Sequence, residues 1–388
     1  MVGIMEVYLD NSATTKTDDD VIELMSRVMG EDYGNPSSKH MKGVDAEKYL
    51  RMTGEILSGI LKVGQKEIIY TSGGTEANNL ALIGTALANK RAGKHIISTV
   101  FEHESVSEPL KFLEKEGFEI TYLPVDNNGH LSPDDIKAAL RPDTILVSTM
   151  FVNNEIGAVQ DVSAIGKLIK EINPDTVYHV DAVQAFGKFE IKPKKQKIDL
   201  LSVSAHKIHG PKGVGFLYKN ENIKLKPLML GGGQQRGMRS GTDNVPAVAG
   251  LGLAAHNAYA CLKEITTRET ALKDRLTAGL EAMGGVKINS RKGELSAPHI
   301  VSATFTPVKS EVLLHALEEK GIYVSAGSAC ASNRKRKSET LKAIGLSVPE
   351  QDCTLRFSLS KYNTESEIDY TLGVLAGLLP VLSRFVSK

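Results

Sequence analysis

The sequence contains no tryptophan, only 5% aromatic residues and no excess of charge of either sign. Aromatic side chains form the stacking platforms for single-stranded nucleic acid, so their scarcity argues against such a partner. The 47 basic and 46 acidic residues give a formal net charge of +1, which removes the electrostatic case for binding nucleic acid. Cys261, Cys330 and Cys353 form no CxxC pair, so we expect no disulfide framework, a reducing compartment and at most one special thiol.

Long hydrophobic runs and several well-known motifs are also missing. The first residues, MVGIMEVYLDNSATT, contain no basic segment followed by an apolar one, and no run approaches the length of a membrane span. We therefore expect a cytoplasmic protein without a membrane partner. The chain has no P-loop, no GxGxxG after a first strand and no HExxH, so nucleotide hydrolysis, dinucleotide redox chemistry and zinc proteolysis lose support, and we predict no metal site.

The 388 residues, 41% hydrophobic and 24% charged, are typical of a soluble protein of two or three domains. Strand and helix periods alternate from about residue 18 to 220, which predicts an α/β domain with a mainly parallel sheet flanked by helices. A long helical segment from about Val245 through Leu280 leads into a smaller α+β unit. We assign residues 16–255 to the large domain and residues 1–15 and 256–388 to the small one. The strands predicted for the large domain are Glu67–Thr71, His95–Ser98, Glu119–Leu123, Thr144–Ser148, Thr176–Val180, Leu200–Ser204 and Val214–Tyr218.

Lys207 is the first candidate for chemistry. It follows an apolar run that ends in SVSAHKIHGPKGVG, where glycines and a proline prevent a helix. An amine at the end of a buried strand is partly removed from water, which favours its neutral form, able to attack a carbonyl and form a Schiff base. The alternative is a surface lysine extending from a Gly-rich turn.

Polar motifs follow other predicted strands, at the sheet edge where open parallel sheets bind ligands. SGGTEANN (72–79) opens a helix whose free N–H groups suit a phosphate, although an ordinary helix start is the alternative. His103 in FEHESV lies at a strand-to-helix turn, where most histidines are structural. In GGGQQRGMRSGTDN, Arg236 and Arg239 are candidate anion contacts, in what could otherwise be a flexible or subunit-contact loop.

Two further strand ends carry amides and a carboxylate. Asn153 and Asn154 lie in VNNEIG, where turn formation is the alternative role. Asp181 directly follows an apolar strand, with Gln184 one turn later. A buried Asp181 needs a cationic partner unless it only caps a helix.

Taken together, these groups form the protein half of a pyridoxal phosphate (PLP) site. Such a site combines a lysine, an Asp that pairs with a protonated ring nitrogen, a Gly/Thr phosphate cradle and an imidazole. The Asp matters electronically, because a protonated ring is an electron sink for a carbanion formed on a bound amino acid.

The motifs resemble those of the PLP-dependent cysteine desulfurases of fold type I, in the NifS/IscS-like class. The resemblance covers nearly the whole chain, in YLDNSATT, GNPSS, VNNEIG, HVDAVQ, HKIHGPKGVG, GGGQQRGMRSGT and RFSLSKYNTESEID. It implies a fold-type I PLP-dependent transferase that converts L-cysteine to L-alanine.

The resemblance also implies a role for each candidate. Lys207 is the Schiff-base lysine, Asp181 the pyridinium partner and Gln184 a donor to the ring hydroxyl. His103 stacks on the ring and moves protons, with Asn154 beside the cofactor and substrate. The residues expected to hold the phosphate are Gly74, Thr75, Ser204 and His206, with Thr242 from the other subunit of a homodimer. Arg356 in CTLRFS is expected to bind the substrate carboxylate, although a surface ion pair is the alternative.

Cys330 distinguishes a desulfurase from other PLP enzymes. It lies in SAGSACASN (325–333), a small polar loop, whereas Cys261 and Cys353 lie in or beside predicted regular elements and are expected to be inert. The resemblance implies that Cys330 takes sulfur as a persulfide for an acceptor such as an iron–sulfur scaffold or a thiolation protein.

Two departures from the family pattern are visible. The loop continues as NRKRK (333–337), either a solvated charge run or a docking site for an acidic acceptor, and Gln235 stands where an acidic residue is usual. Two rival functions stay open: a PLP lyase or aminotransferase for another amino acid, including selenocysteine, and a non-catalytic sulfur-relay or assembly partner that has kept the fold.

Overall fold

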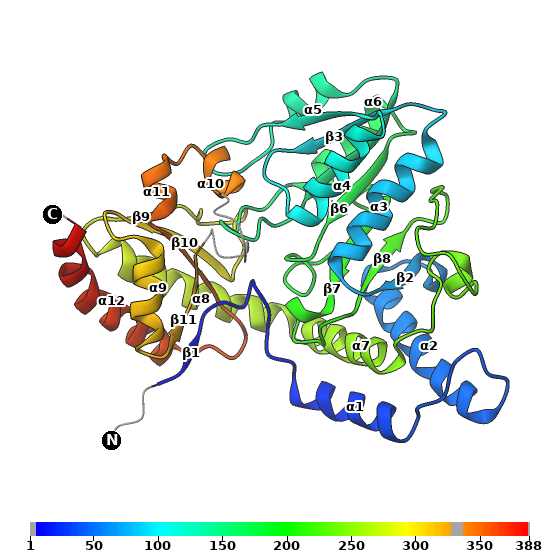
Figure 1. The fold of residues 1–388 in the computed structure, drawn as a ribbon, viewed down its shortest axis with the longest axis horizontal. Coiled ribbons are helices and arrows are strands. Elements are labelled where there is room, and N and C mark those ends of the chain that lie inside the picture. The colour runs from blue at the N-terminus through cyan, green and yellow to red at the C-terminus, as the bar shows by residue number, and fades with distance from the viewer. Residues whose placement is uncertain (1–4, 327–336, 387–388) are drawn as a thin grey trace.

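The computed structural model describes residues 5–326 and 337–386, which form two lobes (Figure 1). The larger lobe contains a seven-stranded sheet in the order β2-β8-β7-β6-β5-β3-β4. Its strands are β2 (Ile68–Thr71), β3 (His95–Thr99), β4 (Glu119–Leu123), β5 (Thr144–Met150), β6 (Val177–Asp181), β7 (Leu200–Ser204) and β8 (Gly215–Lys219). All neighbours pair in parallel except β8, which is antiparallel to β2 and β7. The predicted mainly parallel sheet is therefore confirmed.

Helices cover both faces of this sheet. Those of the large lobe are α1 (Asp19–Gly30), α2 (Met41–Leu61), α3 (Gly74–Asn89), α4 (Glu104–Lys115), α5 (Pro133–Ala139), α6 (Val162–Ile172) and α7 (Val245–Ala260). Strand β7 is buried over its whole length, and its side chains alternate between the two apolar clusters, with Leu200 in one and Leu201 and Val203 in the other. This pattern is expected of a strand covered on both faces.

The smaller lobe is an α+β unit. A four-stranded sheet has the order β12-β13-β10-β9, and β1 pairs with β11 beside it. These strands are β1 (Val7–Tyr8), β9 (Val286–Ile288), β10 (Ile300–Phe305), β11 (Ile322–Tyr323), β12 (Ser325–Ala326) and β13 (Thr354–Ser358), and the helices are α8 (Leu262–Glu281), α9 (Ser310–Glu318), α10 (Glu339–Ala343), α11 (Val348–Asp352) and α12 (Glu365–Val386). Its core is an apolar cluster separate from those of the large lobe.

The predicted long helix from Val245 through Leu280 was wrong in one respect. It is two helices, α7 and α8, bent by 72° at a break where Cys261 has φ −117° and ψ 21°. Cys261 is therefore an exposed junction residue and not part of a continuous helix. The break arises because α7 packs on α1 and α2 of the large lobe, whereas α8 packs on α12 and β9 of the small lobe. Within the described ranges, no single helix has the length and apolar character of a membrane span, although the bent α7–α8 pair does by those two criteria.

The first residues of the chain join the two lobes. Strand β1 pairs with β11 of the small lobe, and the backbone N–H of Asn11 donates to the carbonyl oxygen of Ser358, with an N···O distance of 3.2 Å. Four residues later, the Thr15 amide N donates to the carbonyl of His206 in the large lobe at 2.9 Å. This segment therefore runs directly past the turn that carries Lys207.

Candidate active site

A cavity of about 300 Å³ lies at the carboxyl ends of β5, β6 and β7. Its lining is contributed by both lobes and by the first residues of the chain. It contains Ser12, Ala13, Gly74, Thr75, His103, Ser105, Met150, Val152, Asn154, Asp181, Val183, Gln184, Ser204, His206, Lys207 and Arg356. Among the described residues to which the family resemblance assigns a role, only Thr242 is absent from this lining. Thr242 is exposed elsewhere on the surface, and Cys330 lies outside the described residues.

The Lys207 amine reaches into the cavity from a short 3-10 turn, Ala205–Lys207, directly after β7. Its Nζ donates to the carbonyl oxygens of Ser12 and of Ala13, the latter at 2.8 Å. His206 beside it contacts the hydroxyl of Thr14 through Nδ1 at 3.2 Å. Burial, reinforced by the charges of Lys207 and Lys212, lowers the pKa of His206 to about 4, so its imidazole is neutral at pH 7.

Asp181, the last residue of β6, is 4% exposed. Its Oδ2 accepts a hydrogen bond from Nδ2 of Asn78 at 2.8 Å, and its Oδ1 accepts one from the amide of Val183 at 3.0 Å. Both partners are neutral. A buried carboxylate with neutral partners suits a cationic ligand group such as a protonated ring nitrogen.

A candidate phosphate site lies at the start of α3. Gly73 has φ +148°, in the region that favours glycine, and a Cβ on Gly74 would lie 2.7 Å from Cγ2 of Val183. Thr75, Ser204 and His206 also line the cavity, and the Ser204 hydroxyl would lie 3.6 Å from a Cβ on Gly73. The free N–H groups and the positive dipole end of this 16-residue helix favour an anion here.

Arg356 faces the cavity from β13 of the small lobe and is 6% exposed. Its Nη1 donates to the carbonyl oxygen of Asn154 at 2.9 Å, and its Nη2 donates to Oδ1 of Asp10 at 2.7 Å. Its Nε is buried and has no partner among the described residues, nor has the buried hydroxyl of Ser12. Buried donors left unpaired in this way suit an incoming carboxylate.

These observations test the fit of PLP. The cavity brings together an amine, a buried carboxylate with neutral partners, a helix N-terminus with a glycine that packing requires, and an unpaired guanidinium donor. They match, in turn, the aldehyde carbon, the ring nitrogen and the phosphate of the cofactor and the carboxylate of an amino acid. The residues present therefore fit PLP with an amino-acid substrate.

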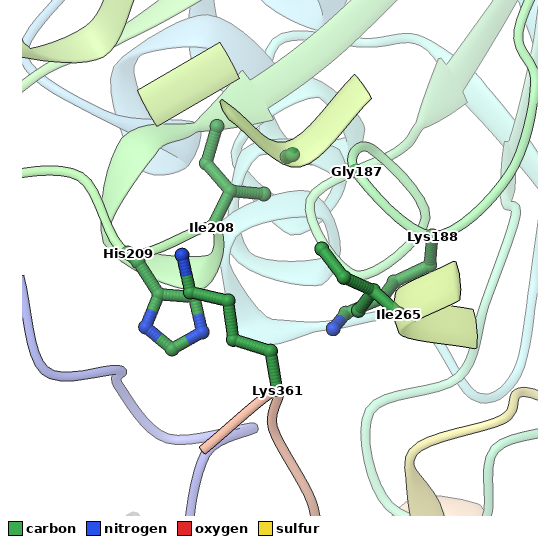
Figure 2. A pocket seen from close by; sticks show the side chains of 7 residues that line it. Gly187, Lys188, Ile208, His209, Ile265 and Lys361 are labelled. Atoms are coloured by element: carbon green, nitrogen blue, oxygen red, sulfur yellow. The ribbon is translucent and has the colours of Figure 1, made fainter. Parts of the chain in front are cut away.

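A second, much smaller cavity lies beyond the Lys207 turn (Figure 2). Its volume of about 10 Å³ has room for one water molecule, and it is lined by Gly187, Lys188, Ile208, His209, Ala258, Ile265 and Lys361. Lys188 pairs with the carboxylate of Glu269, and Lys361 pairs with Asp18 at 2.6 Å. Because these cations are compensated, this cavity is structural.

Arg236 and Arg239, expected as candidate anion contacts, bind protein groups instead. Arg239 pairs with Glu76 at 2.9 Å, and Arg236 donates to the carbonyl oxygens of Lys66 and Ile68. Gln235, which stands where an acidic residue is usual, accepts a bond from the Tyr70 amide at 2.8 Å. This segment therefore packs against β2 and does not enter the cavity of its own chain.

Several residues around the cavity were missed by sequence reasoning. Asp10 holds Arg356, Asn78 bonds Asp181, and Ser105 contacts His103 at 2.8 Å. These three residues lie in the motifs YLDNSATT, SGGTEANN and FEHESV, which the sequence analysis identified. A local sequence pattern does not reveal which distant side chain each of them contacts.

The chain is similar to characterised families over nearly its full length. The model of the aminotransferase class-V family matches residues 7–371. Cysteine desulfurase IscS of Clostridium botulinum strain Hall is 44% identical over 96% of this chain and 94% of its own, and IscS of Methanosarcina thermophila is 42% identical over 97% and 92%.

Comparison with solved structures supports the same family relationship. A NifS-like protein superimposes with a TM-score of 0.92 at 38% identity, covering 97% of this chain and 100% of its own. SspA in complex with cysteine superimposes with a TM-score of 0.80 at 33% identity, covering 92% and 100%. The chain therefore belongs to the aminotransferase class-V family, as a PLP-dependent enzyme of the NifS/IscS-like cysteine desulfurase type.

Proposed function

We propose that the protein is a cysteine desulfurase that converts L-cysteine to L-alanine and stores the sulfur as a persulfide on Cys330. The observation that carries this proposal is the single cavity in which Lys207, Asp181 and Arg356 converge, in a chain 44% identical to a cysteine desulfurase. The overall change balances: L-cysteine and the Cys330 thiol give L-alanine and the Cys330 persulfide.

Residues of both lobes bind the substrate. Arg356 binds the carboxylate of cysteine through its unpaired Nε and its Nη groups, and Asn154 lies beside it. Bound PLP supplies a protonated ring that withdraws electrons from the substrate and makes its carbon–sulfur bond cleavable. Asp181 would stabilise that ring charge, Gln184 would donate to the ring hydroxyl, and Gly74, Thr75, Ser204 and His206 would hold the phosphate.

Proton movement falls to Lys207 and His103. Lys207 would hold the cofactor, and its Nζ, which donates to the carbonyl oxygens of Ser12 and Ala13, is placed to carry a proton. The Cys330 thiolate attacks the substrate sulfur: the S–S bond forms, the carbon–sulfur bond breaks, and its electron pair returns to carbon, which is protonated to give alanine.

The position of Cys330 along the chain supports its role. Strand β12 ends at Ala326, and its Ser325 pairs with Arg356 of β13. Cys330 follows Ala326 by four residues, which span about 14 Å at most when extended. A thiol carried on so short a tether from the carboxylate-binding strand is within reach of a substrate held by Arg356.

The experiment that tests the function is incubation of the purified protein with cysteine under reducing conditions while alanine and sulfide are measured together. Equal amounts of both are expected. Cys330→Ala should retain the PLP absorbance and release no sulfide, and Lys207→Ala should lose the pyridoxyl label after borohydride reduction. A Cys330→Ala variant with normal turnover would refute the persulfide assignment. Selenocysteine, run in parallel, tests the rival substrate.

We also propose a homodimer in which Thr242 reaches the phosphate site of the partner subunit. Thr242 is exposed, and so are large apolar side chains nearby in sequence, between α1 and α2, or at the start of α2: Leu230 (82%), Tyr33 (70%) and Met41 (69%). Apolar surface of this kind is typical of a subunit interface.

Complementation tests the shared site. Lys207→Ala and Thr242→Ala chains are co-expressed with different tags and the mixed dimer is isolated. If Thr242 crosses between subunits, one site of the mixed dimer has native residues at both positions, and about half of the wild-type activity is expected. An inactive mixed dimer at saturating cysteine and limiting PLP would contradict the shared site.

The sulfur acceptor and the location are proposed as well. The basic run 333–337 suits an acidic acceptor, such as an iron–sulfur scaffold or a thiolation protein. Radioactive sulfur transferred from the persulfide to the acceptor, and lost when the run is neutralised, is the expected result. The cytoplasmic location stays a prediction that cell fractionation checks.

A further inference from the structure

We propose that Asn78 and Ser105 are positioning residues that hold the imidazole of His103 in the tautomer with its proton on Nε2. The catalytic meaning of this inference rests on the proposed desulfurase function, whereas the tautomer itself does not. Neither residue was among those predicted for the site.

A continuous chain of hydrogen bonds connects Asp181 to His103. Nδ2 of Asn78 donates to Oδ2 of Asp181 at 2.8 Å and to Oγ of Ser105 at 2.9 Å. Oγ of Ser105 lies 2.8 Å from Nδ1 of His103, and the backbone N–H of Ser105 donates to the same nitrogen at 3.0 Å. Asn78 is 0% exposed and Ser105 is 9% exposed, so the bonds of Asn78 to Asp181 and to Ser105 are shielded from water.

The chemistry of the groups sets the direction of each bond. A carboxylate only accepts, so the amide nitrogen of Asn78 must be the atom that faces Asp181. That nitrogen has a second hydrogen, which it gives to Ser105. The Ser105 oxygen therefore accepts from Asn78 and has its own proton free to donate to His103.

The backbone N–H of Ser105 decides the tautomer. It can only donate, so Nδ1 of His103 is an acceptor and carries no proton. This bond also makes His103 the N-cap of α4, with a ring nitrogen in the place usually taken by a Ser, Thr or Asp oxygen. The proton of the neutral imidazole is consequently on Nε2, for which no described residue is a hydrogen-bond partner.

The tautomer has a mechanistic consequence. In this form, neutral His103 gives a hydrogen bond or a proton into the cavity through Nε2 and cannot accept one there. Removal of a proton from the substrate then falls to the amine of Lys207, which enters the cavity from a different strand end. Asn78 also donates to Asp181, the residue expected to pair with the ring nitrogen of PLP. One buried amide therefore orients both Asp181 and, through Ser105, the imidazole of His103.

The decisive measurement is the ¹⁵N spectrum of the His103 ring in protein labelled at histidine, recorded at pH 8 with PLP bound and no cysteine. The chain has ten histidines, and a His103→Gln spectrum identifies the signals. A protonated Nε2 and an unprotonated Nδ1 are expected. A proton on Nδ1 would overturn the proposal, whether or not the protein turns over cysteine.

Kinetics test the positioning role. Ser105→Ala keeps the backbone N–H but removes the hydroxyl, and we expect kcat for cysteine to fall about tenfold with little change in KM, since general acid groups contribute about a hundredfold or more when well placed. Ser105→Thr restores the hydroxyl and should recover most of the rate. Ser107→Ala, in the same helix and outside the chain of bonds, is the matched control. A wild-type kcat in Ser105→Ala, or a failure of Ser105→Thr to recover the rate of a folded protein, would contradict the role.

Discussion

Arg356 is oriented before any substrate arrives. Its guanidinium is fixed by the carboxylate of Asp10 at 2.7 Å and by the carbonyl of Asn154 at 2.9 Å, which leaves Nε without a partner in the part of the chain that the structure describes. A planar guanidinium group held in this orientation can donate two hydrogen bonds to a carboxylate, whereas the ammonium group of a lysine presents a single point charge.

We predict that Arg356→Lys raises KM for cysteine at least about tenfold, because hydrogen bonds to charged groups contribute about 1.5–3 kcal/mol. The lysine keeps the charge, so PLP binding should be unchanged. Steady-state kinetics and the PLP absorbance check this. Arg239→Lys, which alters the pair with Glu76 outside the cavity, is the control and should leave KM near the wild-type value. Equal KM values in the two variants would rule out Arg356 as the carboxylate site.

Glu102 is an acid kept protonated at neutral pH. Its Oε1 accepts hydrogen bonds from the Thr99 hydroxyl at 2.7 Å and the Met150 amide at 3.0 Å, while its Oε2 is buried without a partner among the described residues. Burial, reinforced by the nearby charge of Asp181, raises the pKa of Glu102 to about 8.

The raised pKa of Glu102 predicts that the difference in stability between the Glu102→Gln variant and the wild-type protein depends on pH. The folded-state pKa lies above the unfolded value, so the stabilisation by protonated Glu102 is complete below about pH 4.5 and is lost as pH rises through about 8. Glu102→Gln does not titrate, so its thermal midpoint relative to wild type should rise steadily between pH 5 and pH 9. Calorimetry at several pH values measures this. A flat difference for Glu102→Gln would contradict the assignment.

Helix α10 is attached to the cavity wall by its first turn. The Ser338 hydroxyl caps the helix by accepting from the Leu341 amide at 3.0 Å and donates to Oε2 of Glu155 at 2.5 Å. Nδ2 of Asn153 donates to the Thr340 hydroxyl at 3.2 Å, so two residues of VNNEIG hold this turn. The chain re-enters the described fold after the cysteine loop at this point.

We predict that Ser338→Ala loosens α10, because a lost N-cap costs about 1 kcal/mol and the partly buried Glu155 loses a donor. Hydrogen exchange of the α10 amides should speed up about fivefold or more, a local measurement that does not require two-state unfolding of a two-lobed protein. Ser347→Ala, at the N-cap position of α11, removes a hydroxyl that donates to Glu350 and should affect that helix alone. Unchanged exchange in α10 would show that Ser338 contributes no local stability.

Across the whole molecule, a buried ion pair joins the lobes. Lys188, in the turn after β6, pairs with Glu269 of α8, which is 0% exposed (Figure 2 shows the Lys188 side chain). Burial raises the pKa of Glu269, an effect that Lys188 opposes. Buried pairs of this kind are costly to break and contribute little compared with an apolar pair.

A double-mutant cycle tests that account. Lys188→Met leaves an uncompensated buried carboxylate and should cost about 3–5 kcal/mol, visible as a large fall in the thermal midpoint. Lys188→Met combined with Glu269→Leu should recover most of the loss. A double variant as unstable as the single one would show that the pair itself, and not the unpaired charge, supports the contact between the lobes.

The local sequence was sufficient for much of the architecture. Glu119–Leu123 and Leu200–Ser204 were predicted with the bounds that the structure has, and Thr144–Ser148 was short by two residues at its end. The apolar run that predicts Leu200–Ser204 reflects a strand buried over its whole length, whereas Glu119–Leu123 is a partly exposed strand at the edge of the sheet. The break at Cys261 escaped this reasoning, since periodicity does not reveal that consecutive helices pack in different cores.

The sequence alone determined which residue types could hold PLP and cysteine, because motifs at strand ends and their family resemblance preserve that chemistry. Only the tertiary structure decided how those residues are oriented. Asp10 meets Arg356 across 346 positions, and Asn78 meets Asp181 across 103. Contacts over such separations depend on the packing of both lobes and on strand order, which no local pattern records, and they are what aligns the guanidinium and the imidazole for reaction.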